Sequence, residues 1–291
     1  MCDDAEFDDM IEHNLRQGGL SRRALGSLAL GAGIAFALPR VAGAADTTEA
    51  EVEIRTPDGT ADAYFVHPAS GKHPAVLYWP DIFGLRPAFR QMGKRLAESG
   101  YAVLVVNPFY RTKRAPTAPE KANFDDPETR KLLVGLKGTL SPATARTDAQ
   151  AFIAWLDAQA AVDTKRKAGT AGYCMSGPIA FETAATVPER IGAVATFHGG
   201  GLVTGQPDSP HLLIPKMRAR FLIAIAENDD QKQPDAKTVL RDAFANAGLT
   251  SEIEVYPALH GWCPPDSAVY NAEQAERAWE RLLVLLKAAL A

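Results

Sequence analysis

The sequence is poor in cysteine and lacks the residue spacings that bind metals. Its three cysteines, Cys2, Cys174 and Cys263, are too few and too scattered for a disulfide framework. It contains no CxxC pair, no HExxH helix and no other group of residues with metal-ligand spacing. These absences exclude a disulfide-stapled scaffold, and they predict that the protein has no metal site.

Strong charge and long apolar runs are also missing. The chain carries 31 basic and 35 acidic residues, a net charge of −4, and its short basic cluster is Arg111, Lys113 and Arg114. A nucleic-acid surface is therefore not expected. No apolar run beyond the first 44 residues would span a membrane, and there are no internal repeats. The apolar share of 46% is enough to bury a sizeable core.

The N-terminal segment has the features of an export signal. Arg22 and Arg23 precede an uncharged stretch, 24–39, and Ala42 and Ala44 then form an A-x-A-like site. The stretch is too short and too rich in glycine for a comfortable membrane span. The segment resembles a twin-arginine signal, which bacterial export machinery recognises. An uncleaved hydrophobic N-terminal helix is the alternative interpretation.

Cleavage of this signal would leave one domain in the bacterial periplasm. Residues 1–44 hold four basic and six acidic residues, so residues 45–291 keep 27 basic and 29 acidic residues, a net charge of −2. We therefore expect residues 45–291 to form a single domain in an oxidising compartment. A reactive thiol is at risk of oxidation there.

The chain after residue 50 alternates strands with helices. A hairpin turns at Pro57-Asp58-Gly59, and several later strands are continuous apolar runs of the buried parallel type. The pattern predicts an α/β fold with a mostly parallel, doubly wound sheet between flanking helices. The expected strands are 51–56, 61–68, 73–80, 101–109, 167–173, 191–197, 219–226 and 251–257, and the expected helices are 86–98, one starting at Ser141-Pro142, 175–186, 234–247 and 271–290.

One connection is longer than those that α/β units use. Residues 107–140 are polar and punctuated by proline, and their second half has a helical pattern. We interpret them as a flap beside a site at the carboxyl ends of the strands. A surface insertion without function is the alternative.

The stretch "GYCMSG", residues 172–177, has the context of a nucleophile elbow. A strand of small and β-branched residues leads into it, and a helix follows. Such a turn holds its nucleophile in a strained conformation, and the helix start offers N–H groups, here that of Met175, to an oxyanion. Ser176 cannot be the elbow serine, because Cys174 and Pro178 occupy the positions where its flanking glycines would be, and this leaves Cys174 as the candidate nucleophile. The alternative is that Cys174 is a small buried residue.

A candidate acid and base follow two later strands. The strand 219–226 runs into Asp229 and Asp230, and the strand 251–257 runs into His260. The order of nucleophile, acid and histidine is that of hydrolases with this elbow. Counting from the strand favours Asp229, whereas the spacing to the next helix would suit Asp230. His198, in "FHGGG", is expected in the wall of the site.

These residues together resemble the dienelactone hydrolase family. The resemblance covers the whole mature chain, with "WPDIFGLRPAFRQMGKRLAESGYAVLVVNPFYR", "GYCMSG", "AENDD" and "YPALHGW" as its anchors. It implies an α/β-hydrolase domain without a cofactor that opens an unsaturated lactone, a carboxymethylenebutenolidase-like activity. It further implies a Cys174–Asp229–His260 triad, with the N–H of Ile82 as the second oxyanion donor.

Three departures from the family pattern concern the substrate and the thiol. The glutamate that pairs with the family's resting thiol is replaced by Asp81, which is one methylene shorter, and the second elbow glycine is Ser176. Arg111 matches an arginine that binds the substrate carboxylate, but the second such arginine falls on Pro264. A doubly clamped carboxylate is therefore not expected. We expect discrimination among small esters or lactones to come from the flap and from Trp79, Tyr110, Arg111 and Trp262.

A different class of function stays open at this point. A fold alone does not guarantee activity, so an inactive periplasmic binding protein on a hydrolase fold is the competing hypothesis. The reactivity of the Cys174 thiol separates the two hypotheses. The sequence indicates no oligomeric state.

Overall fold

The structure is a computed structural model that describes residues 38–120 and 122–291. Arg22, Arg23 and the greater part of the expected export signal lie outside the described residues. Within the described part of the chain, no helix is both long and apolar enough to cross a membrane. The twin-arginine signal stays a prediction.

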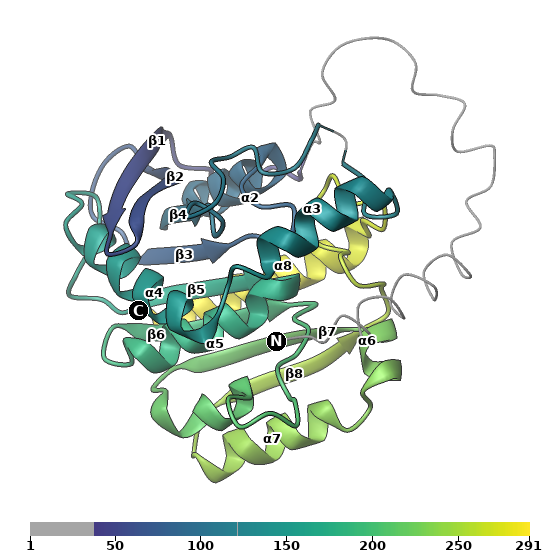
Figure 1. Cartoon of the computed structure of the whole chain (residues 1–291). Helices are drawn as coiled ribbons and strands as arrows, with labels where there is room; N and C mark the ends of the chain where they lie inside the picture. Colours follow the sequence, from purple (N-terminus) through teal and green to yellow (C-terminus); the bar gives the residue numbers. More distant parts are fainter. Residues whose placement is uncertain (1–37, 121) are drawn as a thin grey trace.

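One eight-stranded sheet runs through the molecule (Figure 1). Its order is β1-β2-β4-β3-β5-β6-β7-β8, and β2 is antiparallel to both of its neighbours while the pairs from β4 to β8 are parallel. The predicted mostly parallel α/β sheet is therefore confirmed. The strands are β1 (Thr47–Thr56), β2 (Gly59–Pro68), β3 (Ala75–Trp79), β4 (Ala102–Val106), β5 (Ala168–Tyr173), β6 (Ile191–Phe197), β7 (Arg220–Ala226) and β8 (Ser251–Tyr256).

The central strands form because their apolar residues are continuous. Every residue of β3, β4, β5 and β6 is buried, as expected for strands covered on both faces. The strands at the two edges, β1 and β8, have exposed or half-buried residues instead. The hairpin expected at Pro57-Asp58-Gly59 joins β1 to β2, with Thr56 paired to Gly59.

Helices cover both faces of the sheet (Figure 1). Residues of α2 and α8 belong to the core on one face, and residues of α4, α5 and α7 belong to the core on the other. The predicted start of α4 is confirmed, since Ser141 caps it and Pro142 is its first residue. The helices are α2 (Pro87–Glu98), α3 (Pro127–Lys137), α4 (Pro142–Asp157), α5 (Gly177–Thr186), α6 (Glu227–Lys232), α7 (Ala236–Asn246) and α8 (Ala272–Ala289).

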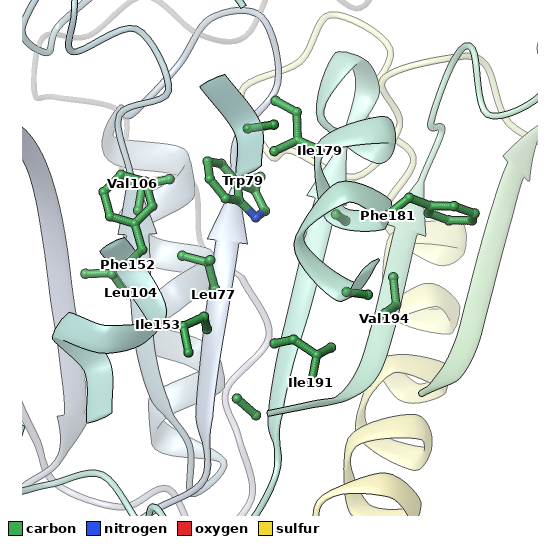
Figure 2. Packing of buried hydrophobic residues seen from close by; sticks show 14 of the residues in the cluster. Leu77, Trp79, Leu104, Val106, Phe152, Ile153, Ile179, Phe181, Ile191 and Val194 are labelled. Carbon is green, nitrogen blue, oxygen red and sulfur yellow. The ribbon is translucent and has the colours of Figure 1, made fainter. Parts of the chain in front are cut away.

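The core beneath α4 and α5 contains a residue that the sequence had suggested for substrate binding. Figure 2 shows Trp79 beside Leu77 and Phe152, in the core that α4 and α5 cover. The Trp79 side chain is 1% exposed, and its ring lies 5.6 Å from that of Phe152. The structure therefore gives Trp79 a place in the core, because it lies within β3 rather than in the loop that follows the strand.

The sheet reverses its order between β3 and β5, where the functional loops meet. β3 is followed in sequence by β4 on one side, whereas β5 is followed by β6, β7 and β8 on the other. The carboxyl ends of parallel strands at such a switch point leave a crevice for ligands. The loops after β3 and β5 carry Asp81 and Cys174 to this crevice.

Two helices, α3 and α6, lie in the loops that follow strands β4 and β7. The second half of the flap forms α3, as its pattern had indicated, and Asp126 caps it by accepting a hydrogen bond from Thr129 N. In Figure 1, α3 lies at the end of the sheet toward which the β3 arrow points. After β7 the acidic stretch forms the short helix α6, which the sequence analysis had not predicted. Acidic residues near a helix start favour this conformation.

Candidate active site

Cys174 occupies a strained turn directly after β5. Its φ angle is 55°, a left-handed conformation that is uncommon for a residue with a side chain. A short 3₁₀ turn, Cys174–Ser176, then leads into α5. A Cβ atom at Gly172 would lie 2.1 Å from Ser176 O, and one at Gly177 would lie 2.9 Å from Gly199 Cα. The two glycines therefore permit the tight strand-to-helix turn that defines a nucleophile elbow.

His260 is held by two polar residues of the short helix α6. Its Nδ1 lies 2.6 Å from Asp229 Oδ2, and its backbone N–H donates to Asn228 Oδ1 at 2.8 Å. Asp230 instead forms an ion pair with Lys237, at 2.6 Å. The histidine contact thus involves Asp229, the acid that counting from the strand had favoured. Asn228 is 1% exposed and was not identified from the sequence.

The Cys174 thiol lies within electrostatic reach of His260. Burial alone would lower the pKa of His260, but Asp229 and Cys174 beside it raise that pKa well above its usual value. Because Nδ1 is bonded to Asp229, Nε2 is the nitrogen available to the sulfur. Nε2 makes no hydrogen bond of standard geometry with the described residues, but a looser hydrogen-bond contact with Cys174 adds to the raised pKa of His260. Such contacts often tighten only when substrate is bound.

An apolar cluster surrounds the thiol. This thiol cluster consists of Ile82, Phe109, Leu133, Leu136, Cys174 and Met175, all of them buried. The flap contributes three of them, two from α3. Cys174 itself is only 5% exposed. The flap therefore shields the thiol from solvent with apolar side chains.

Asp81 pairs with an arginine rather than with the thiol. Its two carboxylate oxygens accept hydrogen bonds from Arg86, at 2.6 and 3.0 Å, and Oδ1 also accepts one from Phe83 N. Arg86 binds Asp266 as well, at 2.7 and 2.9 Å. The prediction that Asp81 pairs with the Cys174 thiol is therefore not met in this structure, because Arg86 occupies the carboxylate. Burial opposes the charge of Arg86, but Asp81 and Asp266 raise its pKa.

Further contacts tie the loop after β3, the loop Pro80–Arg86, to its surroundings. The Ser176 hydroxyl donates to Pro80 O at 2.5 Å, and the flap residue Thr117 donates to Phe83 O at 3.0 Å. Arg86 joins the same loop to Asp266, six residues after His260. The loop that carries Ile82 is thus fixed to the elbow, to the flap and to the histidine loop. The sequence had singled out Ser176 but not these partners.

Arg111 and Tyr110 are occupied by carboxylates. Arg111 binds Asp148 through two bonds, at 2.7 and 2.8 Å, and binds Asp58 at 2.6 Å. Tyr110 donates to Asp148 at 2.8 Å, and its hydroxyl also lies 2.7 Å from that of Thr56. Asp148 is 2% exposed. The guanidinium that the sequence suggested for a substrate carboxylate is therefore already engaged by two acidic side chains.

His198 packs between His260 and Trp262. His198 is fully buried, has a φ of 42°, and places its ring 5.0 Å from that of His260 and 5.1 Å from that of Trp262. Burial, and next the neighbouring His260, lower the pKa of His198 well below its usual value, so its ring is neutral. Trp262 is itself fully buried and stacks on Tyr256. His198 therefore packs against His260, whereas Trp262 packs against His198 and is buried away from solvent.

The second cysteine belongs to a different part of the core. Cys174 and Cys263 are both free thiols, and Cys263 packs with residues of α2 and α8. Burial raises the pKa of Cys263 well above its usual value, which keeps it a neutral thiol. In residues 38–120 and 122–291, no group of three His, Cys, Asp or Glu side chains could hold a metal ion.

Comparisons with known proteins identify the family of this chain. The model of the dienelactone hydrolase family matches residues 61–290. Two relatives are named "Putative carboxymethylenebutenolidase". The protein from Methylorubrum extorquens is 29% identical, and the alignment covers 95% of this chain and 96% of that protein. The protein from Synechocystis is 30% identical, and the alignment covers 78% of this chain and 91% of that protein.

A solved structure shares the fold. It is the Klebsiella pneumoniae protein named "Putative Dienelactone Hydrolase", with a TM-score of 0.71 and 24% identity. The similarity covers 83% of this chain and 99% of that one. The eight-stranded sheet and its helices are therefore those of an α/β-hydrolase.

Proposed function

The chain belongs to the dienelactone hydrolase family and is a hydrolase, and on that premise we propose that Cys174 is its nucleophile against small carboxylic esters or lactones. The observation that carries the proposal is the arrangement around His260. Asp229 binds Nδ1 at 2.6 Å, and Cys174, on its strained elbow, raises the pKa of the same imidazole. A thiolate beside an imidazolium is a competent nucleophile near neutral pH.

The first half of the reaction forms a thioester. The Cys174 sulfur attacks the carbonyl carbon, and the N–H groups of Met175 and Ile82 stabilise the negative oxygen. The C–O bond to the alcohol then breaks, and His260 gives its Nε2 proton to the departing oxygen. Asp229 keeps the proton of Nδ1 in place throughout. An ester loses its alcohol at this stage, whereas a lactone keeps it tethered.

The second half of the reaction consumes water. Neutral His260 takes a proton from water, and the resulting hydroxide attacks the thioester carbonyl. The C–S bond breaks, the acid leaves, and the thiolate and imidazolium are restored. The balance is one ester and one water giving one acid and one alcohol, or one hydroxy acid from a lactone. The proposed steps use only residues of the chain and water.

Hydrolysis of p-nitrophenyl acetate and a simple enol lactone by the mature protein tests the proposal. We expect Cys174→Ala to lose at least about 10³-fold in kcat, as removal of a covalent nucleophile does. Cys263→Ala is the matched control, since that thiol lies in another core cluster, and it should keep its activity. Equal rates for Cys174→Ala and the unsubstituted protein would refute the assignment.

Thiol reactivity distinguishes this enzyme from an inactive binding protein. Iodoacetamide at about pH 6 traps thiolates but spares ordinary thiols. We expect Cys174 in the folded protein to be trapped and Cys263 to stay unmodified. An unreactive Cys174 in a protein that hydrolyses neither substrate supports the binding protein instead.

We also propose that the protein is exported to the bacterial periplasm. The support is in the sequence: Arg22 and Arg23, an uncharged stretch, and the site at Ala42 and Ala44. Cell fractionation followed by N-terminal sequencing tests this proposal, with Arg22→Lys/Arg23→Lys as the export-deficient variant. A cytoplasmic protein that keeps residues 1–44 would overturn it.

A further inference from the structure

The charges around the candidate site indicate which substrates it takes. We propose that this hydrolase acts on esters or lactones whose acyl part is apolar and uncharged, and that it rejects substrates carrying a carboxylate. The inference rests on the proposed role of Cys174. It starts from three features: the thiol cluster, the partners of two arginines, and the flap.

The acyl part of a substrate must lie against the thiol cluster. An acyl group bonded to Cys174 enters the apolar cluster to which Cys174 belongs, together with Ile82, Phe109, Leu133 and Leu136. None of these side chains can donate a hydrogen bond or carry a charge. A carboxylate buried among them would lose its hydration without gaining a hydrogen bond from these side chains, which is strongly unfavourable.

Arg86 is unable to neutralise the charge of a substrate carboxylate. It is 14% exposed and binds both Asp81 and Asp266, so the group of three carries one positive and two negative formal charges. Two of its members, Asp81 and Arg86, lie in the loop that also carries Ile82, and the group as a whole has a net formal charge of −1. The group therefore repels an anionic acyl chain instead of attracting it.

Arg111 forms a second group with the same net formal charge. It binds Asp148 and Asp58, which again gives a net formal charge of −1 two residues from Phe109 of the thiol cluster. Arginine recognises a carboxylate through its paired N–H groups, and here those groups are committed to carboxylates of the protein. A substrate carboxylate would have to displace a buried one.

Two cations of the flap are directed at its own backbone. Lys113 donates to Thr117 O at 2.9 Å, and Arg130 donates to Phe124 O at 3.2 Å while its guanidinium lies over the Phe124 ring. These contacts fix the flap that covers the thiol. The flap residues that belong to the thiol cluster are Phe109, Leu133 and Leu136, all of them apolar.

Two esters of equal chain length test the proposal. Mono-p-nitrophenyl glutarate carries a terminal carboxylate that p-nitrophenyl valerate lacks, and both have the same leaving group. We expect kcat/KM for the valerate to exceed that for the glutarate by about 100-fold or more, after subtraction of the rate with Cys174→Ala. Equal or faster turnover of the glutarate would overturn the inference and leave the proposed function standing. Hydrolysis of neither ester would overturn both.

A substitution that introduces a positive charge, Leu132→Arg, provides a second test of the inference. Leu132 is half-buried on α3 and packs against the thiol cluster, so the long side chain of Leu132→Arg can keep its charge near water while reaching the site. We expect Leu132→Arg to lower the ratio of kcat/KM for the valerate to kcat/KM for the glutarate by about 5-fold or more. Leu132→Gln, which is polar but uncharged, is the matched control and should not lower this ratio. An unchanged ratio in Leu132→Arg, with its fold confirmed by circular dichroism, would contradict the inference.

Discussion

Ser176 illustrates how a single hydroxyl can connect two halves of the proposed oxyanion site. It is fully buried and donates to Pro80 O at 2.5 Å, which links the elbow that carries Met175 to the loop that carries Ile82. The family resemblance implies glycine at this position, so the serine adds a bond that glycine cannot make. The relative placement of the two N–H groups therefore depends on a side chain that does not touch the substrate.

The first prediction concerns this hydroxyl. Ser176→Ala should lower kcat by about 10-fold while changing KM little, because misplaced oxyanion donors weaken transition-state binding. It should also lower the free energy of unfolding by about 1 kcal/mol. Thr183→Val is the control, since it removes another buried hydroxyl that donates to a carbonyl, Ile179 O, away from the oxyanion loop. Equal effects on kcat in the two variants would show that Ser176 has no role in positioning.

The second prediction concerns the charge of His260. Its folded-state pKa is raised above its ordinary value by Asp229 and Cys174, against the effect of burial. The contribution of such a group to the free energy of unfolding has its full value below about pH 6.5, and it is lost as the pH rises through the raised pKa. The difference in free energy of unfolding between the unsubstituted protein and His260→Gln should therefore shrink from about pH 6 to about pH 9. Urea unfolding measures it, and a difference that grows with pH would contradict the assignment.

At the scale of elements, the loop after β3 and the helix α3 hold the site together. The loop Pro80–Arg86 contacts the elbow, the flap and the loop after β8, while α3 contributes Leu133 and Leu136 to the thiol cluster. The flap interpretation of residues 107–140 gains support from these contacts. An insertion without function would have no reason to bury apolar side chains around a candidate nucleophile.

The third prediction concerns the link between the loops. Arg86→Gln leaves two carboxylates, 9% and 23% exposed, without their cation, and it should lower the free energy of unfolding by about 3 kcal/mol. Arg90→Gln is the control, because Arg90 pairs with the exposed Glu51 and should cost less than about 1 kcal/mol. A similar cost for the two variants, measured by urea unfolding, would show that the Asp81–Arg86–Asp266 link adds nothing.

The fourth prediction concerns α3. Leu133→Ala removes a fully buried side chain from the thiol cluster and should raise KM for p-nitrophenyl valerate by about 10-fold, since contact area with the acyl chain is lost. Iodoacetamide should also reach Cys174 faster. Lys131→Ala, at an exposed position of the same helix, is the control and should change neither quantity. Unchanged trapping in Leu133→Ala would show that α3 does not shield the thiol.

At the scale of the whole molecule, the sheet and the triad candidates could be predicted because they follow local patterns. The buried strands are continuous apolar runs, and the elbow, acid and histidine each follow a strand in a fixed chain order. Parallel strands then bring the loops after β5, β7 and β8 to one edge. Asp229, His260 and Cys174 were accessible to sequence reasoning for this reason.

The ionic links could not be predicted in the same way. Arg86 and Asp266 are 180 positions apart, and nothing in the local sequence of either residue indicates the other. The partners of Arg111 lie 53 and 37 positions away, so an arginine that looked free for substrate is bound by Asp58 and Asp148. Trp79 and Trp262 looked like site residues, but both are enclosed by the core. Long-range pairing and the direction of side chains decide these cases.

The central claim is that Cys174 carries the acyl group, and an acid-quenched single turnover tests it most directly. p-Nitrophenyl valerate is mixed with excess protein, and peptide mapping by mass spectrometry locates the bound acyl group. His260→Gln is included because slow deacylation should increase the amount trapped. The account predicts a valeryl thioester on the peptide that contains Cys174 and an unmodified Cys263. Ester consumption with the acyl group on another residue, or with Cys174 unmodified at every time point, would contradict it.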